Sequence, residues 1–389
     1  MRNVLAGLLA AAALGAHAQA PVKVGLVAPF SGVAADYGKQ MEAGIKAYFK
    51  LHGDSAGGRK IEILVRDTGG PNPEVAKRLA QELVTRDKVD FLAGFGFTPE
   101  AMAAAPVATE SKTPMVVMNA ASSVVTTRSP YIARFSMTLQ QVSAPMAQWA
   151  AKNGIKKVYT LVADYAPGID SETAFKNAFT AAGGQVVDSV RVPLRNPEFA
   201  PFVQRIKDAK PEAVFMFVPA GEQSIAFMKA FEERGLAKAG IKVIATGDLT
   251  DDNVLNTMGD PVVGVITSHH YSAHHDSAEN RAFVKAFKEV GGDLKRPNFM
   301  GVGGYDGMAA IAEVVKRLGG QLDGDKAMEI LKNIKLVSPR GPISIDPATR
   351  DIVQTVYIRR VQKIGSEYYN VEFDKFADVK DPGKTEEKK

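Results

Sequence analysis

A strand, a helix and a second strand follow one another between Val89 and Ser123, and this unit constrains the fold more than any other stretch. An apolar run from Val89 to Gly94 leads through a glycine and phenylalanine turn to a helix that opens at Thr98-Pro99-Glu100. A second apolar run, Met115 to Met118, ends in the turn 119–123. In a parallel unit of this kind both turns lie at the same edge of a sheet, where open α/β folds bind ligands.

The start of that helix has the composition of an anion site. Thr98 is predicted to be its N-cap and Pro99 its first helical residue. Free backbone N–H groups and the positive end of the helix dipole would then face the edge of the sheet. Such a terminus binds an anion without a buried lysine or arginine. Ordinary capping explains the same residues, so the anion site depends on the rest of the chain.

Short β-branched runs alternate with amphipathic segments from Val22 onward, which is the pattern of a parallel sheet covered by helices. The first series is predicted to contain strands 23–30 and 61–66, helices 37–51 and 73–86, the 89–123 unit and a run at 132–135. The second series is predicted to contain helices 139–152, 171–182, 198–209 and 222–234 and strands 157–163, 185–192, 213–218 and 241–245. The chain is 389 residues long, enough for two domains of ordinary size. The fold class is therefore α/β, with two doubly wound lobes facing each other across a cleft.

The last third of the chain contains too few helices and strands for a third domain. It is predicted to contain strand 262–268, helices 278–290, 305–318 and 327–334, and a closing strand 354–364 with a hairpin partner at 368–373. These elements suit a chain that crosses between the lobes more than once. We expect a first lobe of residues 21–138 plus 269–337, a second lobe of 139–268 plus 338–375, and a polar tail, 376–389, that is disordered from Asp381.

Residues 1–20 have the features of a secretory signal peptide. Charge at Met1–Asn3 precedes an apolar run, Val4–Leu14, and small residues at 16–20 offer cleavage after Ala18 or Ala20. No later apolar run approaches the roughly 18 residues that span a bilayer. The mature protein is therefore expected to be exported and soluble.

Composition excludes several classes of function. The formal net charge is +5, but basic residues alternate with acidic ones, so a nucleic-acid partner is not expected. The chain has no cysteine and no phosphate-loop, GxSxG or HExxH motif. His269, His270, His274 and His275 do not match a zinc signature, and the glycines of 301–307 do not fit the dinucleotide fingerprint, with Asp306 predicted as a helix cap. No metal or cofactor is expected, and a hydrolase of scattered Ser, His and Asp has no support.

Residues at strand ends are the candidate ligand contacts. Ser31 and Tyr37 follow the first strand and either contact a ligand or only shape the turn. Thr98 and Ser122 occupy matching places on neighbouring turns, so their hydroxyls can converge on one carboxylate. Asp248 ends a strand of the second lobe and is either the partner of a ligand ammonium group or the N-cap of a short helix.

The order of several short motifs resembles the type I periplasmic solute-binding proteins of the leucine/isoleucine/valine-binding family. In chain order they are KVGLVAPFSGVAADYGKQMEAGIKAYF, AGFGFTPE, MVVMNAASS, VADYAPG, ATGDLTDDN and GGYDGM. The resemblance covers nearly the whole mature chain. It implies two Rossmann-like lobes joined by a three-crossover hinge that closes over the ligand, and delivery to the membrane subunits of an ABC permease.

The resemblance also implies roles for individual residues. The ligand carboxylate would be held at Thr98, Ala120 and Ser122. A ligand ammonium group would be held by Asp248, and Tyr165 would cover the ligand.

Two departures from the family pattern bear on the ligand. The acid is more often Glu than Asp in the amino-acid binders, and Phe95 and Phe97 stand where small or polar residues are common. Both leave room for an aromatic or other small carboxylic acid in place of a branched-chain amino acid. With Ser31, Tyr37 and Phe97 added to the site, we expect a non-enzymatic ligand-capture protein of an ABC importer; the alternative is a periplasmic sensor subunit of the same fold.

Overall fold

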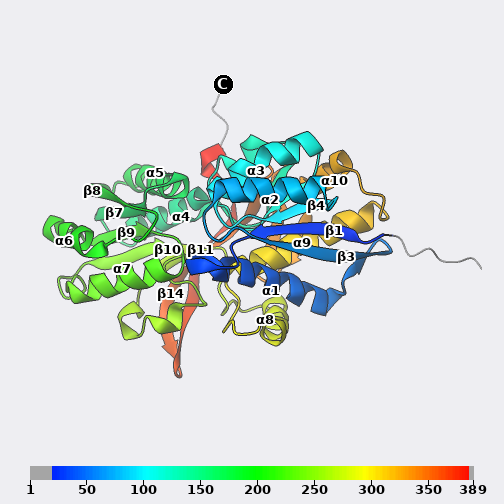
Figure 1. The fold of residues 1–389 in the computed structure, drawn as a ribbon. Helices are drawn as coiled ribbons and strands as arrows, with labels where there is room; N and C mark the ends of the chain where they lie inside the picture. Colours follow the sequence, from blue (N-terminus) through cyan, green and yellow to red (C-terminus); the bar gives the residue numbers. More distant parts are fainter. Residues whose placement is uncertain (1–19, 385–389) are drawn as a thin grey trace, which may run out of the picture.

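The computed structural model describes residues 20–384, and it folds into two lobes that lie side by side (Figure 1). Apart from Ala20, the predicted signal peptide lies outside the described residues, as does the end of the chain from residue 385. Each lobe has a central sheet with helices on both faces, which confirms the predicted α/β class. Within the described part of the chain, every helix is too short or too polar to cross a membrane.

The first lobe contains a six-stranded sheet in the order β2-β3-β1-β4-β5-β6, parallel except for β2. Its strands are β1 (Val22–Ala28), β2 (Ser55–Ala56), β3 (Arg59–Asp67), β4 (Phe91–Gly94), β5 (Met115–Val117) and β6 (Ile132–Arg134). Its helices are α1 (Ala35–His52), α2 (Pro73–Thr85), α3 (Thr98–Ser111), α8 (Ala278–Val290), α9 (Phe299–Arg317) and α10 (Gly324–Leu331). Strands β4, β5 and β6 are buried throughout because helices cover both faces, as apolar parallel strands require.

The second lobe is built on strands that pair in the order β14-β11-β10-β9-β7-β8, with β15 on the other edge of β14 and β12 and β13 continuing the ladder. The second-lobe strands are β7 (Lys157–Ala163), β8 (Gln185–Val192), β9 (Ala213–Phe217), β10 (Lys242–Thr246), β11 (Ile266–His269), β14 (Ile352–Ile364) and β15 (Glu367–Val379). The two strands that continue the ladder, β12 (Lys335–Ser338) and β13 (Gly341–Ile345), lie on the first lobe, whose core contains Ile343 and Ile345. The second-lobe helices are α4 (Leu139–Lys152), α5 (Ala166–Ala181), α6 (Phe199–Ala209) and α7 (Glu222–Glu233). Apolar side chains of α4 and α5 form one core layer, and those of α6 and α7 form another.

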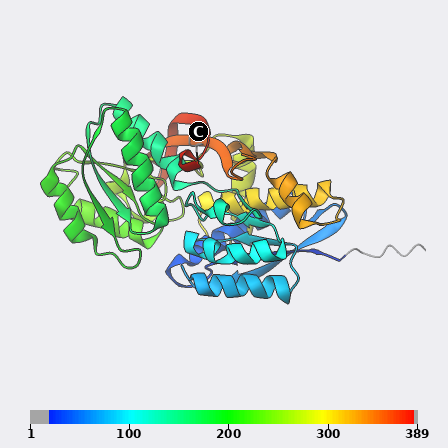
Figure 2. The same ribbon diagram turned by 90° about the horizontal axis from the view of Figure 1, so that it is seen from above.

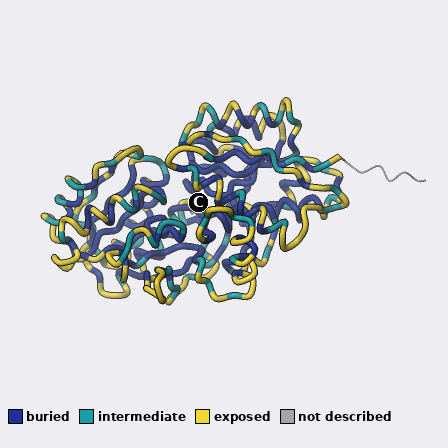
Figure 3. The backbone as a smooth tube through the Cα atoms, turned by 60° about the horizontal axis from the view of Figure 1, so that its bottom comes forward, coloured by how far each residue is buried: buried dark blue, intermediate teal, exposed yellow. Residues whose placement is uncertain are grey.

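The chain passes between the lobes after β6, after β11 and along β14, in agreement with the predicted three crossovers (Figure 2). Ile352 and Val356, early in β14, belong to the core of the first lobe. Ile358 and Val361, later in the same strand, belong to the two core layers of the second. Core membership thus changes within β14, further along the chain than the boundary predicted at residue 338. Figure 3 shows that buried residues lie in the interior of both lobes.

Two predicted helices begin earlier than expected. Helix α5 starts at Ala166, so the predicted turn after β7 is shorter, and α9 starts at Phe299 and includes the glycines of 301–307. Asp306 is consequently not a helix cap: it is buried inside α9, where its carboxylate pairs with Arg340 at 2.8 Å. Conversely, β11 begins only at Ile266, and β2, β12 and β13 were not predicted.

Glycines in α9 allow it to lie directly against α1. A Cβ atom on Gly304 would stand 2.2 Å from the Met41 carbonyl oxygen, and one on Gly44 would stand 1.9 Å from the Gly301 carbonyl oxygen. Real side chains cannot occupy such positions. Close backbone packing, which a sequence pattern does not display, is the reason that a glycine-rich stretch forms a helix here.

The prediction of a disordered end is wrong for residues 381–384. Strand β15 continues to Val379, and Asp381 is buried with its carboxylate accepting a hydrogen bond from the Ser123 hydroxyl at 3.0 Å. Lys384 pairs with the buried Asp351. These long-range partners, rather than local propensity, hold the segment in place.

Candidate functional site

The turn after β4 places the ring of Phe97 in the lining of the cavities between the lobes, while Phe95 is buried in the core of the first lobe. Phe95 has a left-handed backbone, with φ of 63°, and its N–H donates to the Val27 carbonyl at 2.6 Å. Phe97, not Thr98, is the N-cap of α3, because the Glu100 carboxylate accepts the Phe97 N–H at 3.0 Å in place of a hydroxyl cap. The prediction of Thr98 as the cap is therefore wrong by one residue.

Thr98 is freed from capping and faces the turn after β5. Its Oγ1 atom accepts the Ser122 N–H at 3.1 Å, so the hydroxyl proton remains available to a ligand. The Thr98 N–H lies in the first turn of α3, where no intrahelical acceptor exists. A carboxylate placed here would meet a hydroxyl donor and the positive end of the helix.

A buried arginine fixes the backbone of the turn after β5. Arg134 donates from Nη1 to the carbonyl oxygens of Ala120 and Ser122, at 2.8 and 2.7 Å, and pairs with Asp351 at 2.6 Å. Both carbonyl oxygens accept hydrogen bonds from Arg134. Ala121 stands between these two residues in the chain and lines the inner cavity described below. The described residues supply no acceptor for the Ala121 N–H.

The second lobe places a carboxyl group opposite α3. Asp248 follows β10 and is 5% exposed; the Thr246 hydroxyl donates to its Oδ2 atom at 2.9 Å. Burial raises the pKa of Asp248 to about 6, against the lowering effects of the Thr246 hydroxyl and the positive charge of Arg359. Because burial disfavours the charged form of this carboxyl, a ligand hydroxyl or ammonium group that donates to it would stabilise that charged form.

A small inner cavity joins the two lobes. Residues at or after the ends of seven strands contribute to it, those of β1, β4, β5, β6, β7, β9 and β10. Its lining residues are Tyr37, Gly96, Phe97, Thr98, Asn119, Ala121, Met137, Leu139, Tyr165, Pro167, Phe217, Pro219 and Asp248. The cavity holds about 20 Å³, so a ring can enter only if side chains or lobes move.

Aromatic rings form two walls of the inner cavity. Tyr37 stacks on Phe97 with ring centroids 5.0 Å apart, and Tyr165 stacks on Phe217 at 6.1 Å. Burial raises the pKa of both tyrosines well above the ordinary value, so both are neutral phenols. Flat apolar walls, with Thr98 and the N-terminus of α3 on the first lobe and the Asp248 carboxyl on the second, can accommodate a planar acid.

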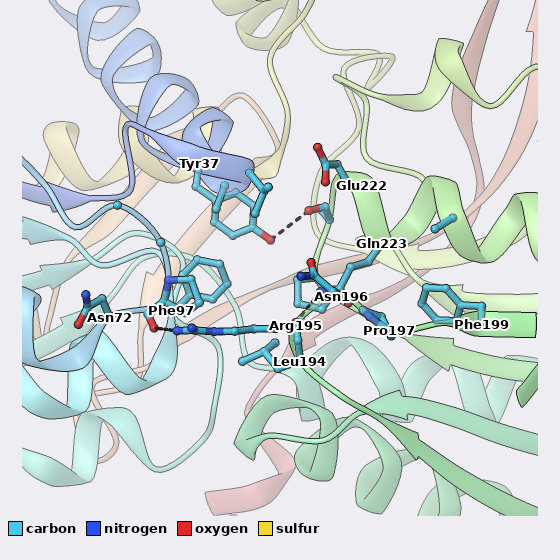
Figure 4. Close-up of a pocket in the computed structure, with 18 residues that line it drawn as sticks. Tyr37, Asn72, Phe97, Leu194, Arg195, Asn196, Pro197, Phe199, Glu222 and Gln223 are labelled. Atoms are coloured by element: carbon cyan, nitrogen blue, oxygen red, sulfur yellow. Dashed lines mark hydrogen bonds between the residues drawn. The ribbon is translucent and has the colours of Figure 1, made fainter.

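A larger outer cavity of about 520 Å³ adjoins the inner one and shares Tyr37, Phe97 and Pro219 with it (Figure 4). Two hydrogen bonds cross between the lobes at its edges. The Tyr37 hydroxyl donates to the Ala220 carbonyl at 3.4 Å, and Arg195 Nη2 donates to the Pro71 carbonyl at 3.3 Å.

The fold agrees with comparisons to known proteins. A family model described as periplasmic binding protein matches residues 21–366. The chain belongs to the periplasmic binding protein family. This periplasmic binding protein is 47% identical over 363 residues to a Leu/Ile/Val-binding protein homolog 6 of Brucella melitensis, a match that covers 93% of each chain. Its family and its structural neighbours are the solute-binding proteins of ABC transporters, which are not enzymes.

Two solved structures extend the comparison to ligands. A solute-binding protein of an ABC transporter from Rhodopseudomonas palustris BisB5, in complex with 3,4-dihydroxybenzoic acid, is 57% identical, with a TM-score of 0.91 and coverage of 94% of this chain and 99% of that one. A second R. palustris solute-binding protein, in complex with 4-hydroxybenzoate, is 44% identical, with a TM-score of 0.90 and coverage of 93% and 99%.

Five of the eight predicted site residues line the inner cavity of this periplasmic binding protein. They are Tyr37, Phe97, Thr98, Tyr165 and Asp248. Ser31 is exposed and lies outside the lining, and so does Ala120, whose N–H donates to the Phe95 carbonyl. In place of Ala120, the next residue, Ala121, lines the inner cavity.

Ser122 contacts the opposite lobe rather than the cavity. Its hydroxyl donates to Asp170 Oδ2 in α5 at 2.6 Å, and the Ser123 N–H donates to the same oxygen at 2.9 Å. A carboxylate of the protein itself thus takes the Ser122 hydroxyl, which the sequence predicted as one of the ligand contacts.

Sequence reasoning missed several residues of the site. Arg134, which is buried, could have been noticed in the sequence, because it is a charged residue within the apolar run 132–135. Arg195, Gln223 and Asp170 gave no such indication, because their places depend on the approach of the two lobes. His269 and His270 are buried against Phe299, and no group of three potential ligands within residues 20–384 is arranged to hold a metal ion.

Proposed function

We propose that this periplasmic binding protein captures a small aromatic carboxylate of the hydroxybenzoate class in the inner cavity. The observation that carries the proposal is the pairing of Thr98 and the N-terminus of α3 with Asp248 across aromatic walls. The ligand carboxylate would accept hydrogen bonds from the Thr98 hydroxyl and N–H and the Ala121 N–H. A ring hydroxyl would donate to Asp248 from the other lobe.

Closure explains how such a site can be tight and reversible without chemistry. Contacts from both lobes to one ligand favour the closed form over the open form by the difference in their affinities. Hydrogen bonds to the charged carboxylate are individually strong once water is excluded. We infer that the closed, liganded form delivers its ligand to the membrane subunits of an ABC importer, after export to the periplasm with residues 1–20 removed.

A branched-chain amino acid is the second candidate ligand. Relatives at 47% identity are named as Leu/Ile/Val-binding protein homologues, and Asp248 is chemically suited to an ammonium group. The aromatic acid is favoured because stacked rings line the cavity and because two relatives that are 57% and 44% identical hold hydroxybenzoates. A sensor subunit with the same site would differ only in the partner that recognises the closed form.

A thermal-shift screen of the ligand-free mature protein tests the proposal. The panel contains 3,4-dihydroxybenzoate, 4-hydroxybenzoate, benzoate, leucine and valine. A ligand at about 100 times its dissociation constant adds about 2.7 kcal/mol to the free energy of unfolding. Stabilisation by the hydroxybenzoates and not by leucine is expected, whereas stabilisation by leucine alone would contradict the proposal.

A further inference from the structure

The outer cavity has the size and lining of a binding site in its own right. Its volume of about 520 Å³ lies within the range of small-molecule sites. Apolar side chains from both lobes cover much of its wall, including Phe97, Leu194 and Phe199. It persists even though hydrogen bonds join the lobes at its edges.

Charge in the outer cavity is concentrated in two side chains. Among the described residues that line it, Arg195 is the only cation and Glu222 is the only carboxylate. Figure 4 shows the Arg195 side chain extended from the second lobe toward Phe97, with its bond to the Pro71 carbonyl. That bond uses one N–H of a guanidinium group that has five, so most of the donors remain for an anion.

Gln223 adds an acceptor at the wall of the outer cavity. Its Nε2 atom donates to the Leu194 carbonyl at 2.6 Å, and its buried Oε1 atom has no partner among the residues described. A buried acceptor without a donor is costly, so a hydroxyl donor reached by a small turn of this side chain would be favoured.

We propose that the outer cavity is a second binding site for an aromatic carboxylate, which holds the acid at Arg195 before it passes the Tyr37–Phe97 stack into the inner cavity. The proposal rests on the proposed function, because it assumes an aromatic acid as ligand. The ring of the acid lies against Phe97 and Leu194 while its carboxylate pairs with Arg195. Glu222 opposes the docking of an anion.

Stopped-flow mixing with 3,4-dihydroxybenzoate tests this site through rates rather than through affinity. Charges at the rim of a site act mainly on the association rate and its salt dependence. We expect Arg195→Gln to lower the association rate constant by about 3- to 10-fold and to flatten its dependence on salt. Glu222→Gln should raise the same constant by about 2-fold.

A control variant and two contrary outcomes distinguish this proposal from a role of Arg195 in joining the lobes and from failure of the proposed function. Arg205→Gln removes the same charge from an exposed position on α6 and should leave the association rate within about 2-fold of wild type. Faster dissociation of Arg195→Gln at an unchanged association rate would overturn the proposal and leave Arg195 as a clasp between the lobes. Failure of wild-type protein to bind the acid at equilibrium would instead overturn the proposed function.

Discussion

At the scale of single residues, Thr98 and Asp248 are held in place by their own lobes and face the same cavity. The Ser122 N–H orients the Thr98 oxygen, and the Thr246 hydroxyl orients the Asp248 carboxyl. Each therefore presents one remaining hydrogen-bonding function to the ligand. Preorganisation of this kind reduces the cost of binding.

In the proposed site, replacement of Thr98 by alanine removes a charge-assisted donor to the ligand carboxylate. We expect Thr98→Ala to weaken every carboxylate ligand by about 1 to 3 kcal/mol, as measured by isothermal titration calorimetry. Thr109→Ala, on an exposed turn of the same helix, is the matched control. Equal affinity of Thr98→Ala and wild type would remove Thr98 from the site.

Asp248 should discriminate ligands by their donor groups. In Asp248→Asn the anionic acceptor is lost, so we expect 4-hydroxybenzoate to lose about 5- to 50-fold in affinity while benzoate, which lacks the hydroxyl, changes by less than about 3-fold. Competition titration of the two acids with wild type and with Asp248→Asn measures the ratio of their dissociation constants in each protein. A parallel loss for both acids would mean that Asp248 does not contact the ring hydroxyl.

At the scale of elements, the turns after β4 and β5 and the packing of α1 on α9 position the first-lobe half of the site. Helix α1 carries Tyr37, and its backbone meets α9 at Gly44 and Gly304. The position of Tyr37 in the cavity therefore depends on a close approach of α1 to α9 that only glycine permits.

A methyl group at the α1–α9 contact should be poorly tolerated. The Cβ atom of Gly304→Ala would lie 2.2 Å from the Met41 carbonyl, so the helices must separate. We expect a loss of about 2 kcal/mol or more in the free energy of unfolding, from denaturant titration. Ala309→Gly on the same helix, expected to cost about 1 kcal/mol, provides the comparison. A smaller loss for Gly304→Ala than for the control would show that this contact adapts freely.

At the scale of the whole molecule, contacts between the lobes and a set of buried carboxyl groups govern closure and stability. Asp170 joins α5 to the turn that follows β5, and Arg195 donates to the Pro71 carbonyl across the lobes. Both sets of hydrogen bonds form only when the lobes are together. The Asp170 hydrogen bonds favour the closed form without touching the ligand.

Loss of the Asp170 contact should favour the open form. In Asp170→Ala the Ser122 hydroxyl and Ser123 N–H lose their acceptor across the cleft. We expect ligand dissociation to accelerate by about 3- to 10-fold and the radius of gyration of the ligand-free protein, from X-ray scattering, to increase. Asp164→Ala, an exposed substitution in the same lobe, serves as control. An unchanged dissociation rate would exclude a role for Asp170 in closure.

Buried carboxyls should make the fold less stable as pH rises above neutrality. Burial raises the pKa of Asp251 to about 8, and the nearby negative charge of Asp252 adds to the rise. An unfolded aspartate titrates near about 4, so between these values the folded state binds more protons and its stability falls with increasing pH. Burial likewise raises the pKa of Glu100 to about 7.

Thermal unfolding between pH 6.5 and 9 tests this behaviour. Burial lowers the pKa of His269 and His270, an effect of opposite sign that raises stability with pH until the unfolded histidines lose their protons, within about one unit of pH 6.5, so it opposes the fall only in the lowest part of this window. We expect the midpoint of wild type to fall as pH rises, and Asp251→Asn to reduce that fall. Asp293→Asn, at an exposed position, should leave it unchanged. An identical pH profile for Asp251→Asn and wild type would contradict the assignment.

The sequence by itself determined the doubly wound architecture and the placement of polar residues at strand ends. Helix 139–152 and strands 157–163 and 185–192 were predicted with their observed bounds, because hydrophobic period, caps and breakers are local properties. Asp248, Tyr165 and Thr98, which line the inner cavity, were predicted as ligand contacts because they lie on the segments that follow apolar strands.

Only the tertiary structure decided which face of each turn meets the cavity. Ala121 rather than Ala120 lines it, because Arg134 holds the neighbouring carbonyls from a distant strand end. Ser122 binds Asp170 rather than facing the inner cavity, because α5 approaches the turn when the lobes meet. These outcomes depend on contacts between residues far apart in the chain, whose distances and charges no local pattern encodes.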